Sequence, residues 1–545
     1  VAHALLDAPV IAEQRSSLWD DGRADEFLLR AGKVQNLRRA ARAFNGVVVP
    51  AGQTFSFWAQ LGRMSARRGF AVGREIISGC VVPTLGGGIC QLSNALAQAA
   101  VAAGIELTEW HRHSARIEAA QPLDVDATVA WNYVDLRLRA PFALRIEVDL
   151  SATTLTVRLR AMDTAAAPDT AGRRPLKVLP IVPATPPVAR GCLTCGETSC
   201  FRHQPAGRHV QARRALALGA HSPEAADWVA SLAATDGMPT DWVLGWERAA
   251  RRQWAPAPGH TIQWLHAPTW RRMAHSAWQR LRGPAGEGGA RQRGQQRHAD
   301  DLGRAIARAL RPEQTELALT QDLLVPLWRA GALVGRTFDV WVDALPAAEL
   351  QRRLDIAAQR HPEAASLRDF RIDAAWARDE GQALAAARQR VTAHADVARV
   401  LQARGLAVQR RPWPAPTAAA PSPRQPMEVI TLVFPASALA RKGSLTVAAV
   451  ARQLRARVIV LGTPPATQAP EWAGVEWRPM RYADPAWLNA DAVLLPAWVE
   501  HRPQTLLRAL AAGLPVIATP ACGLDAQAGL YLVPPGDEQA TLAAV

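Results

Sequence analysis

The sequence predicts a multidomain protein: an α+β domain first, then a short Cys/His metal-binding loop, then an α/β region with parallel strands. A chain of 545 residues is too long for one hydrophobic core. Residues 129–160 alternate between apolar and polar side chains, as antiparallel strands do. Residues 427–545 instead contain short, wholly apolar runs typical of buried parallel strands.

Hydrophobic content, net charge and cysteine spacing limit which partners and which cellular location we expect for this protein. The chain is 49% hydrophobic and 20% charged, and it has no apolar run of about 18 residues that would cross a membrane. The net charge of +15 comes mostly from arginine without interleaved aromatic residues, so we expect no specific nucleic-acid partner. The cysteine spacing favours a reducing compartment, and we expect a cytoplasmic or membrane-peripheral location. Because residue 1 is Val and the last residues resemble an interrupted helix, we expect a fragment.

The predicted first domain, residues 1–161, is organised around the run Gly86–Gln91. Its three glycines indicate a tight turn, and apolar residues at helical spacing indicate a helix that begins near Cys90. Amides at a helix N-terminus stabilise negative charge, so the pKa of this thiol is expected to fall. Residues 1–45 are expected to be mostly helical, with a strand at Val47–Val49.

A base and a carboxylate for this thiol follow along the chain. If the segment after Glu109 is a strand, His111 and His113 share one of its faces. Cys, His and Asp form the set of a thiol nucleophile, so we predict that Cys90, His113 and Asp126 converge. His111 is the alternative base. The other interpretation is a small buried cysteine that begins a core helix beside two surface histidines.

A loop rich in cysteine follows a linker. Residues 162–190 are rich in Ala and Pro and are expected to be a semi-extended linker. Residues 191–205 carry a Cys-x2-Cys-x4-Cys-x2-His array, whose spacing suits chelation of one ion. We predict that this loop binds zinc, and an iron–sulfur cluster is the alternative. If no metal binds, the loop is a redox dithiol or has no ligand. The expected ligands are Cys192, Cys195, Cys200 and His203.

The remaining chain is expected to form two further domains. Residues 206–411 are predicted to be largely helical with some β/α alternation, and residues 283–298 a low-complexity loop. Residues 412–426 are a proline-rich linker. In the last domain, residues 427–545, four short strands are predicted at 429–434, 458–461, 492–495 and 516–518.

Spaced motifs in the first domain resemble the VanW family. They are Asn45-Gly46, Pro50–Phe57, Gly86–Gln91, His113-Ser114 and Asp126–Thr128. The resemblance covers roughly residues 30–160. It implies an association with vancomycin-resistance clusters and the cell envelope. It identifies a domain and not a reaction.

The C-terminal domain resembles that of retaining GT-B glycosyltransferases, which have a Rossmann-type fold. The resemblance is carried by Trp498–Thr519, Arg441–Gly443 and Val533–Asp537, and residues 206–411 would then be the acceptor half. It implies that Lys442 binds the donor diphosphate, and that Glu500 lies against the sugar. Arg441 would replace an arginine that the family has at the position of Ser437. The amides that follow Pro503, at Gln504, would also contact the diphosphate. One departure is Arg508, which replaces a glutamate that accepts ribose hydroxyls.

Three functions are compatible with these patterns. The favoured one is a nucleotide-sugar-dependent, retaining GT-B-type enzyme with an accessory VanW domain, acting in envelope or surface polysaccharide metabolism. Its partners would be a nucleotide-sugar and an envelope glycan or peptide acceptor. The second is a thiol-dependent acyl or amide enzyme centred on Cys90. The third is a non-catalytic scaffold with a degenerate transferase fold.

Overall fold

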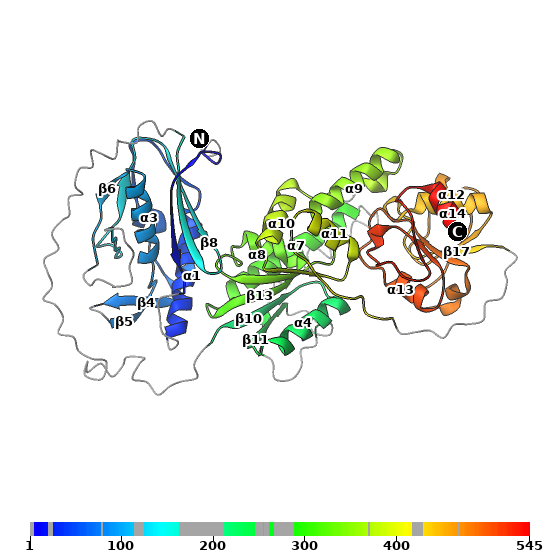
Figure 1. Cartoon of the computed structure of the whole chain (residues 1–545), viewed down its shortest axis with the longest axis horizontal. Coiled ribbons are helices and arrows are strands. Elements are labelled where there is room, and N and C mark those ends of the chain that lie inside the picture. Colours follow the sequence, from blue (N-terminus) through cyan, green and yellow to red (C-terminus); the bar gives the residue numbers. More distant parts are fainter. Residues whose placement is uncertain are drawn as a thin grey trace, which may run out of the picture.

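A computed structural model gives the fold as three bodies that follow one another along the long axis of the molecule (Figure 1). The structure describes residues 5–19, 26–77, 80–113, 125–162, 211–245, 254, 261–265, 288–368, 371–416, 429–466 and 469–545. No helix within these ranges combines the length and apolar character that crossing a bilayer requires.

The N-terminal body is built on a four-stranded antiparallel sheet. Its strands, in spatial order, are β1 (Val10–Ser17), β9 (Thr154–Arg160), β8 (Leu144–Leu150) and β2 (Val47–Val49). Strand residues alternate between an apolar face and a face of ion pairs, where Glu147 accepts hydrogen bonds from Arg145 and Arg160. The prediction that residues 1–45 are mostly helical is wrong, since β1 pairs with β9 before the first helix begins.

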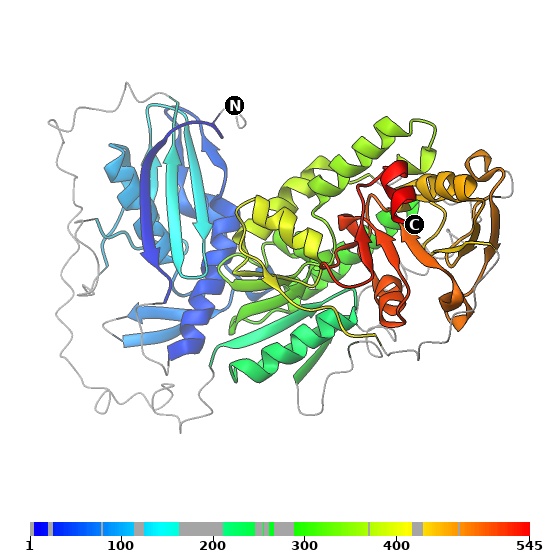
Figure 2. The same ribbon diagram turned by 45° about the vertical axis from the view of Figure 1, so that its right-hand side comes forward.

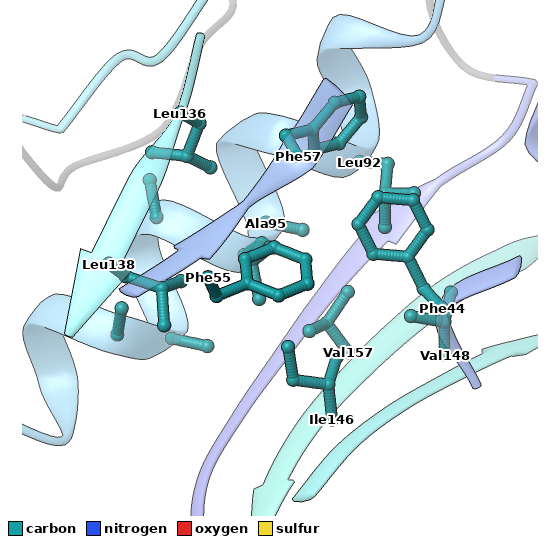
Figure 3. Packing of buried hydrophobic residues seen from close by; sticks show 14 of the residues in the cluster. Phe44, Phe55, Phe57, Leu92, Ala95, Leu136, Leu138, Ile146, Val148 and Val157 are labelled. Carbon is teal, nitrogen blue, oxygen red and sulfur yellow. The ribbon is translucent and has the colours of Figure 1, made fainter. Parts of the chain in front are cut away.

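Two helices cover the apolar face of this sheet. They are α1 (Phe27–Phe44) and α3 (Cys90–Ala102). Phe44 from α1 and Leu92 from α3 meet Ile146 and Val157 of the sheet in one buried cluster (Figure 3). Smaller elements complete the domain: α2 (Phe57–Leu61), the sheet β3 (Thr54–Ser56), β7 (Arg137–Arg139) and β6 (Glu106–Glu109), and the hairpin β4 (Val72–Ile77) and β5 (Cys80–Leu85).

The middle body is a seven-stranded parallel sheet with helices. In spatial order the strands are β12 (Thr261–Leu265), β11 (Thr240–Gly245), β10 (Arg213–Leu218), β13 (Gln314–Thr320), β14 (Thr337–Trp341), β15 (Gln389–Thr392) and β16 (Gln409–Arg410). The helices are α4 (Pro223–Thr235), α7 (Gly288–Ala309), α8 (Gln321–Arg329), α9 (Ala347–Arg360), α10 (Ala374–Ala386) and α11 (Ala395–Ala403). The sequence predicts a largely helical region here with some β/α alternation, whereas the structure contains a seven-stranded sheet. Much of the predicted 283–298 loop is instead the start of α7.

The C-terminal body is a second parallel sheet. Its strands, in spatial order, are β19 (Glu476–Pro479), β18 (Arg457–Val460), β17 (Thr431–Phe434), β20 (Ala492–Leu495), β21 (Val516–Ala518) and β22 (Leu530–Leu532). Its helices are α12 (Ser444–Leu454), α13 (Gln504–Ala511) and α14 (Glu538–Ala544). The four strands predicted in this domain correspond to β17, β18, β20 and β21.

Both parallel sheets are doubly wound. Numbered along the chain, the first six strands of each lie in the order 3-2-1-4-5-6, which is the Rossmann order. The molecule therefore has a GT-B-like α/β region of two parallel sheets after an α+β domain, and Figure 2 shows the two sheets from a second direction.

Helix α1 also joins the N-terminal body to the middle one. Arg38 is buried, and its guanidinium donates hydrogen bonds to the carbonyl oxygens of Val334 and Gly335, both at 2.8 Å. The amide of Gly335 in turn donates to the carbonyl oxygen of Leu150 at 3.2 Å. A buried guanidinium needs such partners, so these contacts fix where the two bodies meet.

Candidate functional site

The first candidate site begins at the glycine turn before α3. Gly86 and Gly88 have φ angles of +83° and +90°, which side chains other than glycine rarely tolerate. Asn36 on α1 holds the turn, because its Nδ2 donates to the carbonyl oxygen of Gly87 at 2.9 Å. The chain then enters α3 at Cys90, so the thiol lies at the N-terminus of the helix.

Cys90 is partly buried against a neighbouring segment of the chain. Its Sγ lies 3.6 Å from Thr128 Oγ1 and 3.7 Å from the carbonyl oxygen of Val129. Ser93, one turn further along α3, donates to the carbonyl oxygen of Ala127 at 2.7 Å. These contacts hold the sulfur between α3 and that segment.

His113 and Asp126 lie beside the thiol. Nδ1–H of His113 donates to Asp126 Oδ1 at 2.6 Å, and the backbone amide of His113 donates to Oδ2 at 2.9 Å. The hydrogen bond to Asp126, with a further hydrogen bond to Cys90, raises the pKa of His113 to about 10. Burial of Asp126 acts to raise the pKa of its carboxyl, but the hydrogen bonds from His113 outweigh burial and lower that pKa. Because Asp126 engages Nδ1, the other ring nitrogen, Nε2, is the one left for Cys90.

Sequence reasoning missed one member of this cluster. The side chain of Asn94 accepts a hydrogen bond from the amide of Ala127 and also bonds Asp126, which helps to lower the pKa of that carboxyl. Asn94 lies four residues after Cys90 on α3, so both face the same side of the helix. That spacing was a signal in the sequence.

The alternative base, His111, is placed differently. Strand β6 ends at Glu109, and His111 forms only an isolated bridge with Thr128. His111 Nε2 lies 3.7 Å from Glu109 Oε1. The structure therefore brings Cys90, His113 and Asp126 together and orients His113, not His111, with the carboxylate.

The second candidate site lies where the two parallel sheets face each other. In each sheet the strand order reverses beside the first strand, between β10 and β13 and between β17 and β20. Ligands of doubly wound sheets bind beyond the carboxyl ends of the strands at such a point. Lys442 follows β17 and Glu500 follows β20, so both predicted donor-binding side chains lie there.

Lys442 and Glu500 bind each other. The ammonium of Lys442 donates to Glu500 Oε2 at 2.8 Å and to the carbonyl oxygen of Val499 at 3.2 Å. Glu500 Oε1 accepts hydrogen bonds from the amides of His501 and Arg502, at 2.9 and 3.0 Å. A donor diphosphate would have to replace this ion pair.

The other predicted donor-binding residues lie close by. Pro503 precedes the first residue of α13, Gln504, whose Nε2 donates to Glu224 Oε1 in the middle body at 3.1 Å. The backbone carbonyl of Arg441 accepts a hydrogen bond from the amide of Trp498 at 3.0 Å. Gln504 thus closes the space between the two sheets instead of lining an open groove.

The buried His394 and the half-buried His501 add further hydrogen bonds at this place. His394 Nδ1 accepts from the amide of Val397, which leaves Nε2–H to donate to the carbonyl oxygen of Glu500 at 2.8 Å. His501 Nε2 accepts from the amide of Leu345 at 3.3 Å. Burial lowers the pKa of both histidines, so both are neutral at pH 7. The cavity left between the bodies here is about 10 Å³, room for about one water molecule.

Arg508, the residue that departs from the transferase pattern, is engaged with aromatic rings. Its guanidinium lies 5.0 Å from the centre of the Tyr482 ring and 5.3 Å from that of Trp487. It also donates to the carbonyl oxygen of Tyr482 at 3.0 Å. These contacts hold the cation on the surface of the C-terminal body.

The predicted metal ligands Cys192, Cys195, Cys200 and His203 lie outside the described residues. Within the part of the chain that the structure describes, no group of three or more His, Cys, Asp or Glu residues is arranged to hold a metal ion. The metal-binding loop is therefore not shown by the structure.

Comparison with known proteins finds a matching family model for a segment near each end of the chain. Residues 32–160 match the family model described as VanW like protein, and residues 431–545 match the one described as Glycosyl transferases group 1. The chain contains a VanW-like domain and a group 1 glycosyltransferase domain. The first candidate site thus belongs to the VanW-like domain, and Lys442 and Glu500 belong to the transferase domain.

The relatives share only the VanW-like domain. It is 27% identical over 135 residues to the Vancomycin B-type resistance protein VanW of Enterococcus faecalis, covering 24% of this chain and 49% of that protein. It is 32% identical over 104 residues to the uncharacterized protein YoaR of Bacillus subtilis, covering 19% and 34%. The chain therefore spans about half the length of the first relative and a third of the second.

A solved structure also matches part of the chain. Sucrose-phosphate synthase from Thermosynechococcus elongatus is 16% identical, over 61% of this chain and 88% of its own, with a TM-score of 0.39.

Proposed function

We propose that the VanW-like domain is a thiol-dependent enzyme that transfers or hydrolyses an acyl group of an envelope peptide. The supporting observation is that Cys90, His113 and Asp126 meet at the N-terminus of α3. The carboxylate orients the imidazole, and the imidazole lies beside the sulfur. This order of thiol, imidazole and carboxylate is the one that acyl transfer by a thiol requires.

The reaction follows from the charges of the pair. The high pKa keeps His113 protonated at neutral pH, and this cation favours the Cys90 thiolate. The thiolate attacks the carbonyl carbon of an amide, and His113 gives its proton to the nitrogen as the C–N bond breaks. A thioester and a free amine result. His113 then removes a proton from a water or an acceptor amine, which attacks the thioester and releases the thiolate.

Alkylation by iodoacetamide tests this proposal, with peptide mapping by mass spectrometry. We expect Cys90 to be labelled faster than Cys80 at pH 6, although Cys80 is the more exposed of the two thiols. Because exposure alone would favour Cys80, faster labelling of Cys90 would report on its neighbours His113 and Asp126. Labelling of Cys90 no faster than that of Cys80 would show that the cysteine is structural.

For the transferase domain we propose nucleotide-sugar binding of the retaining GT-B type, for envelope or surface polysaccharide. The placement of Lys442 and Glu500 at the point where the strand order reverses supports this. The ion pair between Lys442 and Glu500 would have to open before a donor diphosphate binds to Lys442. Glu500 would then lie against the sugar, while Lys442 and Arg441 contact the diphosphate.

Calorimetry with UDP- and GDP-sugars tests donor binding. Replacement Lys442→Ala is expected to weaken binding by about 1.5–3 kcal/mol, the usual value for lost hydrogen bonds to a charged group. Lys442→Arg keeps the charge and serves as the control. If the unmutated protein binds no sugar nucleotide, this half is better interpreted as a scaffold with a degenerate transferase fold.

We also propose that the loop at 191–205 holds one zinc ion, the sequence pattern being its support. Elemental analysis of protein purified without chelators is expected to give about one zinc per chain. Cys195→Ser should remove the metal, because a three-ligand site binds zinc much more weakly. Iron in place of zinc would favour the cluster, and neither metal would refute the proposal.

A further inference from the structure

A cavity of about 400 Å³ lies where α1 of the VanW-like domain meets α7 and α8 of the middle body. Arginine dominates its lining. Helix α1 supplies Arg38, Arg39 and Arg42, and α7 supplies Arg304 and Arg308. Among the described residues that line it, Asp300 is the one carboxylate. Such an excess of positive charge is unusual for an interface inside one chain.

Among the described residues, most of these arginines have no carboxylate partner. Arg38 donates to the carbonyl oxygens of Val334 and Gly335, and Arg42 to that of Ala330 at 2.7 Å. Carbonyl oxygens satisfy hydrogen bonds but carry no net charge. Within the described part of the chain, Arg304 and Arg329 pair with Asp301 and Asp379, and Glu313 acts on Arg336.

Arg39 has a buried donor, its Nε, without a hydrogen-bond partner among the described residues. Burial and the nearby Arg42 lower the pKa of Arg39, and burial with Arg39 beside it lowers the pKa of Arg336 to about 10. The guanidinium groups therefore repel one another around a space that an anion can fill.

We propose that this cavity binds a multiply charged phosphate anion, with the dimensions of a diphosphate, between the VanW-like domain and the middle body. Guanidinium groups present N–H donors in a planar fork that matches phosphate oxygens, and two or more can share one phosphate group. The space is large enough for a diphosphate. The site is distinct from both candidate active sites. Because its lining comes from two bodies, the anion would also fasten them together.

Calorimetry with inorganic pyrophosphate tests the proposal on full-length protein carrying Lys442→Ala, so that the transferase site contributes little. We expect one equivalent to bind, and Arg39→Gln to weaken binding about tenfold or more. Arg308→Gln is a second test, because Arg308 is exposed and its replacement should not disturb folding. Arg15→Gln, at an exposed arginine on β1, is the control and should bind as the parent does.

Each result decides the matter. Equal binding of UDP and pyrophosphate would show that the diphosphate group alone is recognised, and much tighter binding of UDP would assign the site to a nucleotide. Binding that survives both Arg39→Gln and Arg308→Gln overturns the proposal. Binding seen only when Lys442 is intact also overturns it, and places the anion in the transferase domain instead.

Discussion

The two candidate active sites differ in how complete they are. In the VanW-like domain, Cys90, His113 and Asp126 come from one body and already face one another. Between the parallel sheets, Lys442 and Glu500 are paired with each other, and side chains from the facing body close the space above them. The side chains of the first site are oriented toward one another, whereas those of the second neutralise each other.

The difference follows from where each site lies. A site inside one domain is fixed by the packing of that domain, so α3 and its neighbouring segment hold the thiol without any ligand. A site between two domains depends on how far the domains are apart, and its polar groups pair across the gap when no ligand is present. The Lys442–Glu500 ion pair is therefore the arrangement expected of such a site without a ligand.

The largest effect is expected at His113. His113→Ala should slow alkylation of Cys90 at pH 6 by about 100-fold, because the cation that favours the thiolate is gone. The rate at which iodoacetamide labels the Cys90 peptide is the measurement. His111→Ala is the matched control, and it should leave the rate within about twofold, since His111 lies beside Glu109 and not Asp126.

If both replacements slow the reaction equally, the ordering of the cluster by Asp126 has no chemical consequence. The VanW-like domain would then be a binding module. Asp126→Asn distinguishes the two cases further, because it keeps the shape of the side chain but removes the charge that raises the pKa of His113.

A smaller effect is expected at Arg508. Arg508→Glu should strengthen binding of a nucleoside diphosphate by about 1 kcal/mol, through restored hydrogen bonds to ribose hydroxyls. Calorimetry with UDP and GDP measures it. Arg508→Gln is the control, since it also releases the rings of Tyr482 and Trp487 but supplies no carboxylate. An equal gain in both variants would attribute the effect to the aromatic rings, and no gain in either would mean that the ribose lies elsewhere.

Much of the fold could be predicted because local patterns carry it. The apolar runs of the last domain became β17, β18, β20 and β21, and the glycine turn before Cys90 did begin a helix. β1 was missed because its residues, Val10–Ser17, mix charged and small side chains, and only pairing with β9 makes them a strand. The low-complexity composition of residues 283–298 likewise predicts a loop, whereas α7 begins at Gly288.

The sites were harder to predict, because distances between domains are not written in a local pattern. The spacing of Cys90 and the residues after β6 suggested a cluster, but only the structure shows that Asp126 orients His113. Nothing in the sequence indicated that His394 and Gln504 close the transferase site. The arginines of the cavity at α1 lie almost 300 residues apart, so no motif joins Arg38 to Arg336.

The smallest expected effect is on stability, which should depend on pH in opposite directions around His113 in the VanW-like domain and around His501 in the transferase domain. The pKa of His113 is raised to about 10, so its stabilising contribution is complete below its unfolded value near 6.5 and is lost as pH rises toward 10. Burial, with Lys442 and other cations nearby, lowers the pKa of His501. Its neutral form contributes fully above pH 6.5, and the contribution is lost as pH falls below that value.

Hydrogen exchange by mass spectrometry, compared between variant and parent at each pH, tests this because the intrinsic pH dependence cancels. Relative to the parent, His113→Asn should deprotect α3 most below pH 6.5, and the difference should shrink as pH approaches 10. The destabilisation by His501→Asn around α13 should instead be largest above pH 6.5 and shrink toward pH 5. Burial raises the pKa of Asp343 to about 6, so its contribution to stability is lost as pH rises from about 4 to 6, opposite to the contribution of His501. Asp343 is present in both parent and variant, so its contribution cancels in the comparison. If both differences changed with pH in the same direction, His113 would not be held as a cation, and the assembled thiol site would lose its electrostatic basis.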